Sequence, residues 1–176
     1  MPSLPMLSLS LTDNEFPASE ITHDRHAARG IAFDDDGCFY FVRADREDLF
    51  GSVTTIETAG GGVEKDETPE EAVLRELKEE LGADTRLVCK IGVVSDYYNV
   101  LHRHNINHYF LCRVRSFGER ELLPYEANAF HLTTLRLSFE EAEAEYERCA
   151  ASALGRLIRQ REMPVLRRAA ELLKEG

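Results

Sequence analysis

The chain has 176 residues, of which 43% are hydrophobic, so its length fits one ordinary domain with a substantial core. Asp and Glu number 32 against 21 Lys and Arg, and the formal charge of −11 argues against a protein that binds long nucleic acid. No run of about 18 apolar residues occurs, which excludes a transmembrane helix. The first residues lack the basic segment of a signal peptide, so we do not expect one. The four cysteines form no C-x-x-C pair, which favours reduced thiols in a cytoplasmic protein.

Residues 1–24 contain three of the six prolines and no clear hydrophobic period, so we expect an extended arm or a mobile leader there. Residues 25–176 show no internal repeat or low-complexity linker and are expected to form a single domain. Runs rich in β-branched and aromatic residues predict its strands at residues 27–33, 38–42, 53–58, 87–94, 105–114 and 130–135. Asp36-Gly37, between the first two runs, predicts a hairpin.

The clearest helix is predicted after residue 68. Thr68-Pro69-Glu70-Glu71 supplies a capping hydroxyl, a proline at the first helical position and a glutamate that can complete a capping box. Gly82 is suited to the left-handed conformation that ends a helix. Apolar side chains at every fourth position mark the buried face: Val73, Leu77 and Leu81. The charged, glycine-rich residues 59–67 before the helix predict a loop.

Two further helices are predicted near the C-terminus. Ser138 and Glu141 form a second capping box, which predicts a helix from residue 138 to about 151. A third helical stretch spans 154–173, and we expect Pro164 to interrupt it, because proline disfavours helix at the residue before it. Strands come first, with one helix inserted after the third, and this order predicts an α+β fold built as an α/β/α sandwich.

Three carboxylates of the first predicted helix share one face, because Glu76, Glu79 and Glu80 stand at i, i+3 and i+4. Like charges at this spacing destabilise a helix, and a divalent cation such as Mg²⁺, which takes carboxylate and phosphate oxygens, would remove the conflict. Arg75 stands four residues before Glu79 and can pair with it. Most glutamate-rich helices are solvated surfaces, and this is how we interpret the acidic residues 140–147.

The frame around these carboxylates is specific. Gly61 is followed by five residues and Glu67, and seven further residues lead to Arg75-Glu76-Leu77-Lys78-Glu79-Glu80-Leu81-Gly82-Ala83. This segment, residues 61–83, resembles the box of the Nudix hydrolase family, G-x5-E-x7-R-E-U-x-E-E-x-G-U, in which U is a bulky aliphatic residue. Every fixed position is met. Ala83 is smaller than the usual aliphatic residue, which bears on packing and not on metal binding.

The resemblance implies an α+β Nudix fold with a mixed β-sheet, the box as a loop–helix–loop, and extra C-terminal helices from about residue 138. It also implies a MutT-like hydrolase that uses Mg²⁺ or Mn²⁺ to cleave the diphosphate in a nucleoside diphosphate linked to another moiety. The family's metal-binding positions fall on the carbonyl of Gly60 and on Glu76, Glu79 and Glu80.

Catalytic roles in the family pattern fall on Glu79, Glu80 and the orienting Arg75, with Gly61, Glu67 and Gly82 as supporting positions of the motif. Many members add a carboxylate from a loop after the box. Glu119, Glu121 and Glu126 are the candidates here. We prefer Glu126 because it precedes the strand predicted at 130–135, and a plain surface glutamate is the alternative.

Arg29, Tyr98 and His104 are the candidate substrate-binding residues. Arg29 flanks the first strand of the domain and could contact a phosphate, while aromatic and imidazole rings can stack on a nucleobase. The alternatives are a surface charge for Arg29 and a packing aromatic for Tyr98. For His104 the alternative is an exposed hairpin, since no nearby acid or cysteine completes a zinc site with the histidines.

The expected partner is a small nucleoside-diphosphate derivative: a nucleotide sugar, ADP-ribose, a dinucleoside polyphosphate or an NTP. Neither a membrane nor a long nucleic acid is an expected partner. A homodimer is compatible with the sequence. One alternative is a Nudix-fold protein that binds or regulates without catalysis, and another is a hydrolase of a non-nucleotide diphosphate. The intact box glutamates argue against the first, since non-catalytic members usually lose them.

Overall fold

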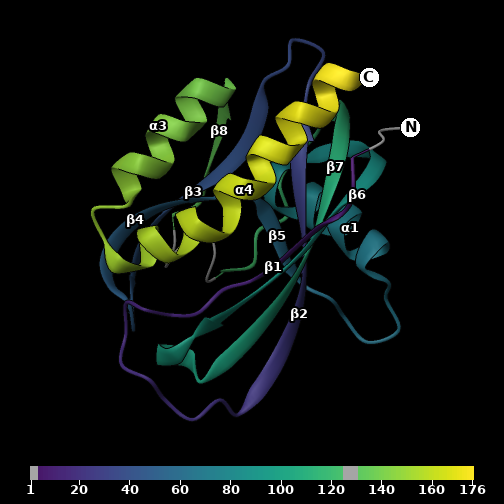
Figure 1. Ribbon diagram of the computed structural model, residues 1–176. Helices are drawn as coiled ribbons and strands as arrows, with labels where there is room; N and C mark the ends of the chain where they lie inside the picture. The colour runs from purple at the N-terminus through teal and green to yellow at the C-terminus, as the bar shows by residue number, and fades with distance from the viewer. Residues whose placement is uncertain (1–3, 125–130) are drawn as a thin grey trace.

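A mixed β-sheet between two helical layers forms the body of the computed structural model, which describes residues 4–124 and 131–176 (Figure 1). The strands are β1 (Leu7–Ser10), β2 (His23–Phe33), β3 (Phe39–Asp48), β4 (Gly51–Glu57), β5 (Ala59–Gly62), β6 (Ala83–Tyr98), β7 (Arg103–Phe117) and β8 (Thr133–Leu137). Over the described residues they run in the order β1-β6-β7-β2-β3-β4, with β5 beside β2 and β8 beside β3. The β1–β6 and β2–β7 pairs are parallel and the other pairs are antiparallel, which confirms the predicted mixed sheet.

The helices divide between the two faces of the sheet. α1 (Pro69–Leu81) covers one face, while α3 (Phe139–Cys149) and α4 (Ala153–Glu175) cover the other, which confirms the predicted α/β/α sandwich (Figure 1). A short 3₁₀ turn, η1 (Asn99–Leu101), joins β6 to β7. None of the helices in the described part of the chain is long and apolar enough to cross a membrane.

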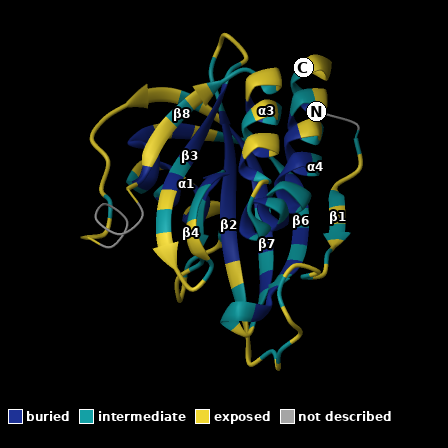
Figure 2. Cartoon of the chain, turned by 90° about the vertical axis from the view of Figure 1, so that its left-hand side faces the viewer, coloured by how far each residue is buried: buried dark blue, intermediate teal, exposed yellow. Residues whose placement is uncertain are grey.

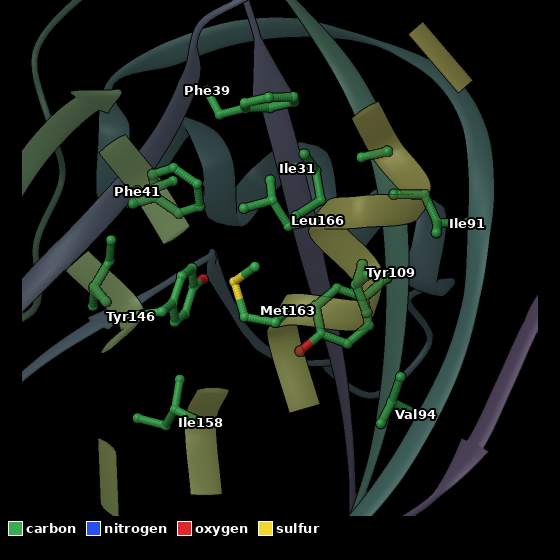
Figure 3. Packing of buried hydrophobic residues seen from close by; sticks show 14 of the residues in the cluster. Ile31, Phe39, Phe41, Ile91, Val94, Tyr109, Tyr146, Ile158, Met163 and Leu166 are labelled. Carbon is green, nitrogen blue, oxygen red and sulfur yellow. The ribbon is translucent and has the colours of Figure 1, made fainter. Parts of the chain in front are cut away.

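The larger hydrophobic core lies between the sheet and α4 (Figure 3), where the side chains of Phe41, Tyr109 and Leu166 are fully buried. A smaller cluster lies under α1. Colouring by burial shows a long buried stretch in β2, where residues 27–32 are all buried (Figure 2). Successive residues of a strand point to opposite faces, so Arg29 shares with Ile31 the face of β2 that α4 covers.

The ends of α1 agree with the prediction. The backbone N–H of Glu71 donates to Thr68 Oγ1 at 3.2 Å, and the N–H of Thr68 donates to the Glu71 carboxylate at 2.9 Å, which completes the capping box. Gly82 ends the helix with φ of 66°, in the left-handed region that glycine adopts without a Cβ clash. Local sequence signals therefore fix both ends of the helix that carries the box glutamates.

The predicted strands are confirmed, and most extend further than the sequence indicates. The hairpin at Asp36-Gly37 is also confirmed, with Phe33 opposite Phe39 across it. The prediction of a loop over 59–67 is wrong at its start, because β5 pairs with β2 there and places Gly60 opposite Arg29. The strand predicted at 130–135 overlaps β8 within the described residues.

The predicted interruption of the last helix at Pro164 is wrong, because α4 runs through it without a break. A proline inside a helix removes one backbone hydrogen bond. The neighbouring side chains of Met163 and Val165 are buried in the core, and this packing holds the helix against the sheet. Tertiary burial therefore outweighs the local preference.

The N-terminal segment lies along the sheet and includes a strand. β1 extends the sheet beyond β6, and the backbone N–H of Asn99 donates to the carboxylate of Asp13 at 2.9 Å. Arg156 of α4 forms an ion pair with Glu15 at 2.8 Å. The segment is thus an extended arm in contact with both the sheet and α4. The division of the chain into residues 1–24 and 25–176 stays a prediction.

Candidate active site

The carboxylates of α1 meet the glycine-rich strand β5. The backbone N–H of Gly60 donates to Glu80 Oε2 at 3.1 Å. Gly61 lies against Glu76, since a Cβ atom at Gly61 would stand 2.5 Å from Glu76 Oε1 and would displace that carboxylate. Both glutamates are buried. The structure therefore brings Gly60, Glu76 and Glu80 together where α1 crosses β5.

Arg75 ties the loop of the box to the glutamates of α1. Its guanidinium donates to Glu76 Oε1 at 2.8 Å and to Glu79 Oε2 at 3.2 Å. On its other side it donates to both carboxylate oxygens of Glu67, at 2.7 and 3.0 Å, and to the carbonyl of Gly62 at 3.1 Å. The hydrogen bonds from Arg75 hold the pKa of Glu67 below its ordinary value. One guanidinium therefore orients three carboxylates.

The donor atoms at this junction suit a hard divalent cation, because Mg²⁺ prefers oxygen ligands and keeps room for phosphate oxygens. Nudix hydrolases generally need a divalent metal. Among the described residues, no three acidic, histidine or cysteine side chains already stand in a coordination arrangement. Instead, the Arg75 guanidinium donates a hydrogen bond to Glu76, and the Gly60 N–H donates one to Glu80. A bound cation would compete with Arg75 for the same oxygens.

A cavity of about 720 Å³ adjoins these carboxylates. It is lined by both acidic and basic side chains: Glu76, Glu79 and Glu80 on the one hand, and Arg25, Arg29, Arg46 and Arg103 on the other. Part of its wall is apolar and exposed, with Leu49 74% and Leu123 51% exposed. The cavity therefore combines groups for a cation, for phosphate and for a less polar moiety.

Arg29 is a buried residue and not a surface charge. Its guanidinium forms an ion pair with Glu57 at 3.3 Å and donates to the carbonyl of Thr58 and to Asn107 Oδ1, both at 3.2 Å. Burial alone would raise the pKa of Glu57, but Arg29 and Arg161 hold it at about 2. Arg29 therefore stays charged in the cavity wall, opposite Gly60 in the β2–β5 pairing.

A buried polar network from α4 supports this wall, and the sequence reasoning missed it. Arg161, 1% exposed, donates to the carboxylate of Glu57 at 2.6 Å, to the hydroxyl of Tyr98 at 2.7 Å and to that of Tyr109 at 3.0 Å. Glu162, fully buried, accepts hydrogen bonds from Thr58 and from the hydroxyls of two tyrosines, Tyr109 and Tyr146. The sequence does contain an indication of this network, in the positions that the two charged residues occupy along the helix.

Two charged residues of α4 occupy positions where the helical period places apolar side chains. Residues 161 and 162 stand four positions after Leu157 and Ile158 and four before Val165 and Leu166, so they lie on the apolar stripe of the helix. Charged residues at core positions are rarely found without partners. Their presence there predicts acceptors and donors on the facing strands.

The other residues predicted for the site are dispersed. Tyr98 lines the cavity but is only 6% exposed, and its hydroxyl is bonded to Arg161. His104 is outside the lining of the cavity. Its ring stacks on that of Tyr97 with centroids 4.6 Å apart and is bonded to Asp24 at 3.0 Å. Glu126 lies outside the described residues. Of the two other candidate carboxylates, Glu121 lines the cavity and Glu119 does not.

Comparison with known proteins matches the part of the chain that contains the box. The sequence model of the NUDIX domain matches residues 24–151. An RNA pyrophosphohydrolase from Hydrogenovibrio crunogenus (strain DSM 25203 / XCL-2) is 46% identical over 50 residues, which are 28% of this chain and 30% of that protein. The chain thus matches less than a third of the length of this relative.

Two solved structures share the fold. A NUDIX hydrolase from Nitrosomonas europaea superposes with a TM-score of 0.57 at 17% identity, over 69% of this chain and 76% of that one. A MutT NUDIX hydrolase from Burkholderia pseudomallei gives 0.54 at 19% identity, over 67% and 85% of the two chains. The match to the family over most of the chain, the complete box and the shared fold lead to one conclusion: this chain belongs to the NUDIX family.

Proposed function

We propose that the protein is a Mg²⁺- or Mn²⁺-dependent hydrolase of the diphosphate linkage in a nucleoside diphosphate joined to another moiety. The observation that carries the proposal is the convergence of Glu80 on Gly60 and of Glu76 on Gly61, at the edge of a cavity that also contains arginines. A cation-binding acidic cluster next to fixed positive charges suits a diphosphate, which needs both kinds of contact. Membership of the NUDIX family and its hydrolase neighbours support this class of reaction.

The contacts of the glutamates, Arg75 and Arg29 suggest a separate role for each. A divalent cation at the glutamates would neutralise charge on the phosphates and lower the pKa of a water molecule. Arg75 keeps Glu76 and Glu79 oriented, since it is held from behind by Glu67. Arg29 offers a permanent positive charge to phosphate oxygens, because Glu57 and the carbonyl of Thr58 fix its guanidinium.

The apolar part of the cavity suits the nucleobase or the distal moiety. The ring of Phe50 lies edge-on to that of Tyr98, with centroids 5.5 Å apart, and the guanidinium of Arg46 lies 5.6 Å from the Phe50 ring. Rings and guanidinium groups are surfaces on which bases stack. The acidic charge of the chain favours a small nucleotide over long RNA, although the one curated relative named above is an RNA pyrophosphohydrolase.

The test is a hydrolysis screen with Mg²⁺ and Mn²⁺ over nucleotide sugars, ADP-ribose, dinucleoside polyphosphates, NTPs and inositol and isoprenoid diphosphates, with identification of the products. We expect cleavage within the diphosphate, and in ¹⁸O-water the label should appear in a phosphate product, because water attacks phosphorus. Binding of a nucleotide without turnover would favour a non-catalytic NUDIX protein. Turnover of the non-nucleotide diphosphates alone would favour the other alternative.

A further inference from the structure

Arg103 is distinct among the arginines of the cavity. Arg29 pairs with Glu57 at 3.3 Å, and Arg46 pairs with Asp48 at 2.6 Å. Among the described residues Arg103 forms no ion pair. Its Nε donates to Asn105 Oδ1 at 2.7 Å, and its guanidinium lies 5.6 Å from the centroid of the Tyr98 ring. A positive charge thus stands in the cavity wall with no carboxylate within ion-pair distance among the described residues.

Asn105 is a second residue at this corner that suits an anion. The residue is 3% exposed, and its Nδ2 has no hydrogen-bond acceptor among the described residues. A buried amide donor without a partner costs free energy, so such groups are rare in folded proteins. Asn105 stands opposite Arg25 in the β2–β7 pairing, and Arg25 also lines the cavity. A buried donor without an acceptor therefore lies beside the arginines of this corner.

The electrostatics agree with the geometry. Burial and the positive charges of Arg25 and Arg29 lower the pKa of Arg103 to about 10, and the opposing effects of Tyr98 and Asp96 do not offset them. A cation that its neighbours repel is stabilised when an anion binds beside it. The corner is therefore electrostatically suited to an anion.

This corner is separate from the carboxylate cluster. In the β2–β7 register Tyr109 lies opposite Arg29, which in turn stands opposite Gly60. Arg103 is six residues before Tyr109 on β7, so its backbone lies roughly 20 Å along the strand from that point. The backbone of Arg103 is therefore remote from that of Gly60, although both residues line the same cavity.

We propose that Arg103, with Arg25 and Asn105 beside it, forms an anion subsite that holds a phosphate group of the substrate other than the diphosphate that is cleaved. The proposal rests on the proposed function and narrows its substrate class. The extra phosphate can come from a longer polyphosphate chain or from a phosphate monoester on a nucleoside. Both sources present anionic phosphate oxygens to the guanidinium.

The kinetic test compares substrates that differ in this phosphate. ADP-ribose lacks it, 2′-phospho-ADP-ribose carries it as a monoester, and diadenosine tetraphosphate carries it within the chain. We expect the wild type to favour one of the last two over ADP-ribose in kcat/KM, and Arg103→Gln to reduce that preference by about ten-fold, mainly through KM. The substrate whose preference is lost identifies the source. Arg113→Gln removes a surface arginine that pairs with Asp35 outside the cavity and should leave the preference unchanged.

A binding measurement separates this subsite from the proposed function. We expect tripolyphosphate to bind the wild type in calorimetry and to bind Arg103→Gln about ten-fold more weakly. Asn105→Asp would place a negative charge of the chain itself beside Arg103. It should therefore weaken tripolyphosphate binding while keeping or raising the melting temperature, a pair of results that a merely structural role for this corner does not give.

The outcomes are distinct. If no substrate is hydrolysed but tripolyphosphate binding depends on Arg103, the proposed function fails and the subsite stands. If hydrolysis occurs but the wild type favours neither phosphate-bearing substrate, the subsite is overturned. The same holds if Arg103→Gln and Asn105→Asp, both folded by thermal melting, change the preference and the binding by less than about two-fold. Should Arg103→Gln fail to fold, Asn105→Asp alone decides.

Discussion

The carboxylate of Glu162 accepts two hydrogen bonds of 2.6 Å from Thr58, one from the backbone N–H and one from the hydroxyl. Thr58 directly precedes β5, whose Gly60 is bonded to Glu80. Glu162 belongs to α4, which lies beyond the residues that match the family, 24–151. A helix outside the matched segment therefore anchors the strand on which the carboxylate cluster depends.

Replacement of Glu162 by Gln should impair catalysis as well as stability. The amide group keeps the shape but cannot accept from all of the donors that now surround the carboxylate, so Thr58 loses part of its anchor. We expect kcat to fall by about ten- to a hundred-fold and the Kd for Mg²⁺, measured by calorimetry, to rise, because small displacements of a site are costly.

The matched control for Glu162 is Leu166→Ala on the same helix. Leu166 is fully buried in the apolar core, and its truncation should lower the free energy of unfolding by about 2–5 kcal/mol. At a temperature where both variants are folded, Leu166→Ala should keep the wild-type kcat and Mg²⁺ affinity. Equal values for the two variants would mean that Glu162 serves the stability of the fold alone.

The box and its helix could be predicted from the sequence because their signals are local. Thr68, Glu71 and Gly82 cap the ends of α1 through contacts within a few residues. The position of Arg75 relative to Glu79 follows from helical geometry alone, and the structure places them 3.2 Å apart. Features of this kind need no knowledge of the rest of the chain.

The support of the site could not be predicted in the same way, because it depends on contacts between distant residues. Arg161 and Glu57 are 104 positions apart in the sequence, and only the packing of α4 on the sheet brings them together. Similarly, the sequence of residues 59–62 predicts a loop, and these residues form a strand only because they pair with β2. For the same reason the sequence did not predict that Arg29 is buried, since its partners come from β4 and β7.

Metal binding should stabilise the fold. Glu76 and Glu80 hold negative charge in a buried position, and a cation that binds only the native state raises the melting temperature through mass action. At a Mg²⁺ concentration of about 100 times Kd, the gain should be near 3 kcal/mol in the free energy of unfolding. The double variant Glu76→Gln/Glu80→Gln should lose this response, and an undiminished shift would place the metal elsewhere.

A methyl group at Gly61 should displace the carboxylate of Glu76. The Cβ of Gly61→Ala would come within 2.5 Å of Glu76 Oε1, so the side chain must move away from the strand. We expect Mg²⁺ affinity to fall by about ten-fold with little change in melting temperature. Gly118→Ala is the control, because a Cβ there would meet its nearest neighbour only at 4.0 Å. Normal Mg²⁺ affinity in Gly61→Ala would argue against a metal-binding role for Glu76.

The ion pair of Glu57 with Arg29 and Arg161 should make stability depend on pH in the acid range. The pKa of Glu57 is about 2 in the folded protein against an ordinary value of 4.5, so its contribution is complete above about pH 5 and is lost as the pH falls towards 2. The loss should amount to roughly 3 kcal/mol in the free energy of unfolding, measured by urea denaturation. Glu57→Gln should show a flatter curve over this range, and parallel curves would contradict the assignment.

Glu80 should be the most sensitive of the box residues in catalysis. Its carboxylate lies against the Gly60 backbone, and reactions at phosphorus depend on charge neutralisation and an aligned water more than on covalent help. Glu80→Gln keeps the shape and removes the charge, and we expect kcat to fall by about 10³-fold, or roughly 4 kcal/mol of barrier, with the fold intact by thermal melting. Arg75→Ala should cost less, because Arg75 orients carboxylates without itself being a ligand. Glu143→Gln, on α3 and outside the cavity lining, should retain wild-type kcat, so near-normal turnover by Glu80→Gln in the same assay would exclude this role for the carboxylate.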